Sequence, residues 1–118
     1  MKSDVPYLRH VADSILAIES YVAGGRDVFM KERLVQDAVI RNFEIIGKAA
    51  RQLSPEVRNR PGLVLGKVIA FRNRLIHGYW SVDLLLVWDV VVNDLPRLKT
   101  EVASRLAELS GPSARPSR

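Results

Sequence analysis

Apolar residues recur at intervals of three and four along most of the chain, which is the spacing that places side chains on one face of an α-helix. Over residues 4–23 the apolar positions are Leu8, Val11, Ile15, Ile18 and Val22. A Gly24-Gly25 pair follows, and glycine is the residue that most readily ends a helix. The pattern therefore predicts a first amphipathic helix over residues 4–23.

A second long helix is predicted to open at Asp27 and to be most regular from Glu32 to Leu53. Its expected apolar positions are Leu34, Ala38, Phe43, Ile46 and Ala50. Ser54-Pro55-Glu56 provides a cap, a first-turn proline and an acidic residue for one short helical turn. The Arg60-Pro61-Gly62 sequence should then break the chain.

The segments Leu63–Phe71 and Val82–Val92 are short and rich in β-branched residues, so periodicity alone leaves two strands of a hairpin open as an alternative. An isolated hairpin is marginally stable, and the intervening Arg72–Tyr79 is long and poor in turn residues. We therefore predict helices, the third running from Val64 to His77 and ended by Gly78.

A fourth helix is expected after Trp80-Ser81, with Ser81 as its cap and Asp83 in its first turn. Nine of the eleven residues from Val82 to Val92 are apolar. One face is enough to cover a small core, so the other face predicts contact with a second copy of the chain.

Asn93-Asp94-Leu95-Pro96 should break or kink this helix. A last amphipathic segment follows, with apolar positions Leu98, Val102, Leu106 and Leu109. The pattern as a whole predicts an all-α antiparallel bundle of four to five helices plus a short turn, homodimeric, in one domain over residues 1–109. The remaining residues 110–118 are rich in Pro, Ser and Arg and are expected to form a disordered tail.

Composition narrows the chemistry. The 118 residues include no cysteine and only two histidines, which excludes disulfides, thiolate nucleophiles and cysteine-ligated metals, and leaves few ligands for a catalytic metal. No signal core and no apolar run long enough to span a bilayer is present, so we expect a cytoplasmic protein without membrane contact.

The net charge of +5 is concentrated in one stretch. From Val57 to Val82 there is no acidic residue, and the basic residues there are Arg58, Arg60, Lys67, Arg72 and Arg74. The positive electrostatic field of this stretch favours binding of a polyanion such as RNA. The candidate RNA-binding residues are Arg58, Arg60, Lys67 and Arg74. A solvated basic surface is the equally simple alternative.

The reactive groups lie in Phe71–Trp80. Arg72 has a planar cation that can bind phosphate oxygens, and His77 can accept and donate a proton near neutral pH. Together they suit attack by a ribose 2′-hydroxyl on the adjacent phosphate, without a metal. Residues five apart on a helix differ by about 140° in direction and about 7.5 Å in height, so the pair does not share a face ideally. Three alternatives for closing the gap stay open: the reach of the arginine, a loosening of the helix before Gly78, or a site that combines residues from two chains. Asn73 does share the face of His77 and could orient it or bind substrate. A histidine before a glycine can also be a simple capping residue.

The sequence RNRLIHGYW, with its Arg-x4-His-x-Tyr spacing, followed by SVDLLLVW, resembles the HepT-like HEPN proteins, the toxins of HEPN/MNT (type VII) toxin–antitoxin pairs. QDAVIRNFEIIGKAA and DLPRLK extend this resemblance over residues 4–109. It implies a homodimeric helical bundle and a metal-independent endoribonuclease acting on tRNA or mRNA. Arg72 and His77 would be catalytic, at the dimer interface, with Asn73 in support.

The same resemblance implies a partner, a minimal nucleotidyltransferase antitoxin (MntA-like) that uses ATP and Mg²⁺ to transfer AMP to the motif tyrosine, here Tyr79. The toxin itself would need no cofactor. A bulky anion near His77 would fill the cleft and repel phosphate. Two alternatives stay open: a non-catalytic RNA- or nucleotide-binding helical module that partners a nucleotidyltransferase, and a purely structural helical dimer.

Overall fold

A computed structural model describes residues 3–77 and 83–114, and the part of the chain that it describes is helical and contains no strand. The helices are α1 (Val5–Tyr21), α2 (Arg26–Lys31), α3 (Arg33–Ala50), α4 (Pro55–Arg58), α5 (Leu65–His77), α6 (Leu84–Asp89), the π-helical turn η2 (Val90–Asp94) and α7 (Leu95–Ala114). The all-α prediction is confirmed, and the hairpin alternative for residues 63–92 is wrong over the described residues.

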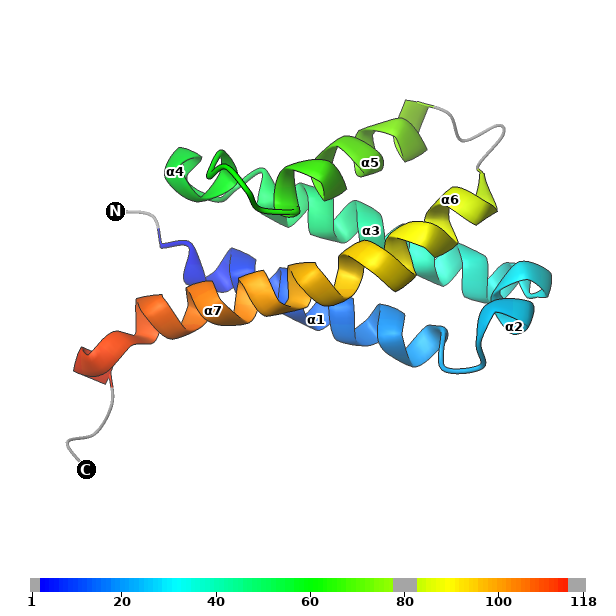
Figure 1. Cartoon of the computed structure of the whole chain (residues 1–118), viewed down its shortest axis with the longest axis horizontal. Coiled ribbons are helices and arrows are strands. Elements are labelled where there is room, and N and C mark those ends of the chain that lie inside the picture. The colour runs from blue at the N-terminus through cyan, green and yellow to red at the C-terminus, as the bar shows by residue number, and fades with distance from the viewer. Residues whose placement is uncertain (1–2, 78–82, 115–118) are drawn as a thin grey trace.

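The long helices pack side by side into an elongated bundle of 50 × 29 × 22 Å. α3 lies between α1 and α5, and α7 crosses α1 (Figure 1). Helices α1, α2, α3, α5, α6 and α7 all contribute core side chains that have no exposed surface. These include Val11, Ile15, Ile18, Phe29, Val39, Phe43, Ile46, Val68, Val87 and Leu98. Burial of this apolar surface provides the main driving force for folding.

Helix α1 buries the face that its spacing predicts, with Val11, Ile15 and Ile18 completely covered. Asp4 precedes this helix but makes no side-chain hydrogen bond to it. Its carboxylate instead accepts hydrogen bonds from the backbone N–H and the hydroxyl of Ser54, each at 2.8 Å. Ser54 precedes α4, so this contact ties the beginning of α1 to the short turn that follows α3.

The predicted second helix is in fact two helices. Glu32 adopts an extended backbone (φ −96°, ψ 106°), which separates α2 from α3. This break changes which residues face the core: Leu34, expected to be buried, is 83% exposed, and Val39 is buried instead of Ala38. From Phe43 onward the predicted face is correct, since Phe43, Ile46 and Ala50 are all buried.

The apolar segment after position 82 begins at Leu84, and the carboxylate of Asp83 caps it by accepting hydrogen bonds from the N–H groups of Leu85 and Leu86. Asp83 therefore has the capping role expected of Ser81, which lies outside the described residues. Instead of a break near Pro96, the chain widens into the π-helical turn η2 and continues as α7. Proline lacks an N–H for the regular helical ladder, and a π-turn is one way to accommodate that loss.

Most of this apolar segment packs within its own chain. Val87, Val90 and Val91 are buried, and Trp88 lies against Phe29 with ring centroids 5.3 Å apart. Leu85 and Val92 remain 56% and 49% exposed. The second apolar face expected from the sequence is thus reduced to a few side chains.

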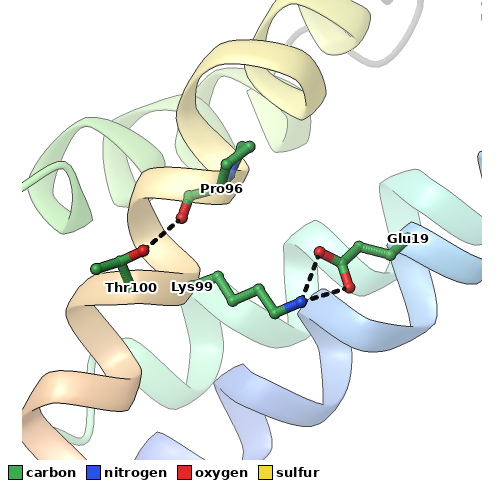
Figure 2. Close-up of polar contacts among 4 residues, drawn as sticks. All are labelled: Glu19, Pro96, Lys99 and Thr100. Atoms are coloured by element: carbon green, nitrogen blue, oxygen red, sulfur yellow. Dashed lines mark hydrogen bonds and ion pairs between the residues drawn. The ribbon is translucent and has the colours of Figure 1, made fainter.

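Helix α7 ends at Ala114, so residues 110–114, expected to be disordered, continue the helix. Adding residues to an existing helix avoids the cost of nucleating a new one, which explains this extension. Lys99 of α7 links this helix to α1, because its ammonium group donates hydrogen bonds to both carboxylate oxygens of Glu19 at 3.0 and 3.1 Å (Figure 2). No helix in the described part of the chain is long and apolar enough to cross a membrane.

Candidate active-site cleft

Arg72 lies in the middle of α5, where that helix packs against α3. Its side chain is partly buried, and its Nε atom is covered but has no hydrogen-bond partner among the described residues. One terminal nitrogen, Nη1, donates a long hydrogen bond of 3.4 Å to the side-chain oxygen of Asn73. Apart from the covered Nε atom, the terminal nitrogens therefore keep donors that bind no described residue.

Gly47 of α3 makes the position of Arg72 possible. A Cβ atom at residue 47 would lie 2.5 Å from Cγ, 2.6 Å from Cδ and 3.0 Å from Cβ of Arg72. Real Cβ contacts are essentially never this short, so any larger residue at position 47 requires the arginine or the helices to move. Gly47 thus allows the arginine stem to lie directly on the backbone of α3.

The guanidinium side of Arg72 faces a cleft of about 460 Å³ formed by α1, α3 and α5. Tyr7 and His10 line the cleft from α1. The lining residues from α3 are Arg41, Glu44, Ile45, Lys48 and Ala49, and Gln52 joins them from the turn just after this helix. Three permanent cations and one carboxylate give the cleft a positive balance, which suits an anionic ligand.

His77 is the last residue of α5, and the helix is continuous from Leu65 to His77. The side chain of His77 is outside the described part of the structure, and so is Tyr79. Because the helix does not loosen between Arg72 and His77, helical geometry keeps them about 140° and about 7.5 Å apart. The structure places Asn73 beside Arg72, and whether Asn73 also orients His77 remains a prediction.

The four candidate RNA-binding residues do not form one patch. Arg58 of α4 donates a hydrogen bond of 3.3 Å to the backbone oxygen of Arg51. The ammonium group of Lys67 lies 2.9 Å from a carboxylate oxygen of Asp94, which is 2% exposed. Arg60 is exposed beside a separate, mainly apolar cavity of about 180 Å³, and Arg74 is exposed on α5. Arg72 is the basic residue of this acid-free stretch that lines the α1–α3–α5 cleft.

The contribution of α3 to the cleft was not predicted from the sequence. Arg41, Ile45, Lys48 and Gln52 follow one another at four-, three- and four-residue intervals, which is the spacing of a single helix face. This second, mostly polar face, and the glycine inside a helix at position 47, were the signals that could have indicated a site there. Among the described residues, no three His, Asp or Glu side chains are close enough together to hold a metal ion.

Comparison with known proteins finds relatives whose names include RNase or ribonuclease. The chain is 42% identical over 112 residues to a Methanocaldococcus jannaschii protein named "Gamma-glutamylcyclotransferase and putative RNase", with 92% of this chain aligned. The alignment spans 50% of that protein, so the chain corresponds to about half of its length.

Two further relatives are matched over most of their length. A "Putative RNase" of Caldanaerobacter subterraneus subsp. tengcongensis is 33% identical over 86% of this chain and 93% of its own. A "Probable ribonuclease HepT" of Thermococcus cleftensis is 32% identical over 83% of this chain and 91% of its own. No solved structure matches the chain.

The model of the family described as "Ribonuclease HepT-like" matches residues 11–104, a range that includes α3, α5 and most of the cleft. With Arg72 at the cleft and His77 five residues later on the same helix, this chain belongs to the HepT-like ribonuclease family.

Proposed function

We propose that this chain is a metal-independent endoribonuclease in which Arg72 and His77 act on the RNA backbone. The observation that carries the proposal is the position of Arg72, which lines an open, positively charged cleft while its guanidinium group makes one long hydrogen bond, to Asn73. Family membership supports the same activity. A partly buried cation with free terminal donors is suited to a phosphate group, whose charge increases in the transition state.

The reaction requires two proton transfers. The ribose 2′-oxygen forms a bond to the adjacent phosphorus, and the bond from phosphorus to the 5′-oxygen breaks. The proton of the 2′-hydroxyl passes to a base, and the leaving 5′-oxygen receives a proton from an acid. Histidine can perform either transfer near neutral pH, so we assign one to His77, while Arg72 stabilises the phosphate oxygens. The products carry a 2′,3′-cyclic phosphate and a 5′-hydroxyl.

Incubation of the purified chain with tRNA and mRNA in excess EDTA tests this function. We expect cleavage that depends on His77 and yields cyclic phosphate ends. An absence of cleavage by the unaltered chain contradicts the proposal. If RNA then still binds in a salt-sensitive manner, the non-catalytic binding module described above is the correct interpretation.

We further propose that the active unit is a homodimer. The positions of Arg72 and His77 on one helix differ by about 140° in direction, so a site that uses both is more easily completed by two chains than by one. Leu85 and Val92, in the segment that follows α5, remain about half exposed and supply apolar surface for such a contact.

Replacing Leu85 by Asp should weaken this dimer at least tenfold, because a carboxylate would be buried without a partner. Sedimentation equilibrium measures the effect. Leu16→Asp is the matched control, since Leu16 is similarly exposed (54%) but lies on α1. A single-chain mass for the unaltered protein, or an equal effect of both substitutions, would exclude this interface.

The final element of the proposal is control by a minimal nucleotidyltransferase antitoxin. In the transfer, the phenol oxygen of Tyr79 bonds to the α-phosphorus of ATP, pyrophosphate leaves with Mg²⁺, and the phenol loses its proton. The added phosphate brings negative charge within two residues of His77, which opposes the binding of RNA.

Incubation of the chain with such a nucleotidyltransferase and ATP–Mg²⁺ should raise its intact mass by one adenylate or a multiple of it, with loss of RNA cleavage. Tyr79→Phe should remain unmodified, whereas Tyr21→Phe, which changes an exposed tyrosine of α1, should be modified normally. Modification of Tyr79→Phe to the normal extent would show that the acceptor is another residue.

A further inference from the structure

The α1–α3–α5 cleft extends well beyond Arg72. From Arg41 to Ala49 its α3 side covers about 12 Å along the helix axis, and Gln52 adds to it from the turn that follows α3. Arg72 approaches this surface from α5, and Tyr7 and His10 approach it from α1. The cleft is therefore much larger than a site for one phosphate group.

Two cations in this cleft are available for binding. Arg41 and Lys48 are exposed, and neither forms an ion pair with any residue that the structure describes. They are seven residues apart on α3, or about 10.5 Å along the axis. Glu44 lies between them on the same helix and is partly buried. Two separated cations on one face suit a chain of phosphates better than a single small anion.

The α1 side of the cleft has a different chemistry. Tyr7 and His10 are three residues apart and thus neighbours on one face of α1, opposite the α3 cations. Tyr7 is partly buried against the core, while His10 is exposed. Aromatic and imidazole rings provide flat surfaces on which unpaired nucleobases stack, without sequence preference.

We propose that this cleft binds the single-stranded RNA segment next to the cleaved phosphate, with backbone phosphates on Arg41 and Lys48 and a base against Tyr7 and His10. Arg72 belongs to both the cleft and the reactive motif, so it would place the bound strand in register with His77. This assignment rests on the proposed function, because it takes RNA as the substrate. It adds a binding surface on α1 and α3, outside the acid-free stretch.

Binding of an uncleavable strand tests the cleft separately from catalysis. The probe is a fluorescent 2′-O-methyl oligoribonucleotide of roughly 12 nucleotides, which lacks the reactive hydroxyl and spans a typical single-strand site. Lys48→Ala and Arg41→Ala should each weaken binding several-fold to about tenfold. Each should also lower the slope of log K against log salt by about 0.7, the value for one phosphate contact on a single strand.

Lys99→Ala is the matched control, because Lys99 lies on α7, is not part of the cleft, and is paired with Glu19 (Figure 2). It should leave binding and its salt dependence unchanged. Circular dichroism of all three variants verifies that each is folded. Equal binding by Lys48→Ala, Arg41→Ala and Lys99→Ala would overturn the proposal, even if the protein cleaves RNA.

Photocrosslinking locates the base. The same strand with 4-thiouridine at each position in turn should crosslink to the α1 peptide that contains Tyr7 and His10. Crosslinks confined to other peptides would exclude this surface. If the chain binds and crosslinks as expected but cleaves no RNA, the cleft assignment stands as a binding site and only the nuclease proposal fails.

Discussion

Replacement of His77 by alanine is expected to reduce RNA cleavage by about 10²–10⁴-fold, the usual contribution of a positioned acid or base. Arg72→Ala should cost about 10²–10³-fold, because it removes the charge that stabilises the phosphate oxygens. Arg72→Lys should recover only part of this loss, since an ammonium group is a point charge without the planar fork of a guanidinium group. Initial rates on a fluorogenic RNA, with substrate below KM, measure all three.

Arg33→Ala is the control for loss of an arginine. Arg33 lies at the beginning of α3, is highly exposed and pairs with Asp37 of the same helix at 3.5 Å. Because exposed pairs of this kind contribute little, cleavage and stability should both be unchanged. If Arg72→Ala or His77→Ala cleaves RNA as fast as Arg33→Ala, the proposed catalytic roles are wrong.

The second large effect is expected from adding one methyl group at Gly47. Gly47→Ala places a Cβ atom within 2.6 Å of two atoms of the Arg72 stem, so the arginine or the helices must move, and we expect the guanidinium group to be displaced. Displacing a catalytic group by about 1 Å can cost about 10²-fold in rate, and we expect a loss of about 10- to 100-fold. The same cleavage assay measures this loss.

The stability of Gly47→Ala should change much less than its activity. Alanine favours a helix over glycine by about 1 kcal/mol, whereas overpacking costs about 1–3 kcal/mol, so the two effects partly cancel. Urea denaturation gives the net free energy of unfolding. Combining Gly47→Ala with Arg72→Ala should remove the packing cost, because Cγ and Cδ of the arginine are then absent.

Gly66→Ala is the matched control for this substitution. Gly66 lies in α5 like Arg72, and a Cβ atom built there meets nothing within 4 Å. The variant should therefore be as stable as the original chain or up to about 1 kcal/mol more stable, with normal cleavage. Normal cleavage by Gly47→Ala as well would mean that the position of Arg72 is unimportant for the reaction.

The elements whose boundaries depend on local chemistry were predictable from the sequence. Helix α5 covers Leu65–His77, almost the whole predicted range, and α4 begins at Pro55 behind Ser54. The buried face of α1 followed directly from its three- and four-residue spacing. These features depend on residues close together in the sequence, which is why the pattern was sufficient.

The features that the sequence did not reveal depend on contacts between distant segments. The extended backbone at Glu32 separates two helices that periodicity had joined, and it leaves Leu34 exposed. The carboxylate of Asp4 binds Ser54, fifty residues away, rather than its own helix. Local conformational preferences are weak compared with tertiary packing. Helix boundaries and side-chain partners of this kind are therefore determined by the packing of the helices against one another.

For the site, the sequence by itself determined the reactive groups: an arginine and a histidine five residues apart on one helix, in a stretch without acidic residues. Tertiary structure alone decided that Arg72 lies on the backbone of Gly47 and faces a cleft completed by α1 and α3. The physical reason is that charge and the ability to transfer a proton are properties of single side chains, so they can be inferred from each residue type in the sequence. A cleft, in contrast, forms only where several surfaces come together, here when α1, α3 and α5 pack against one another.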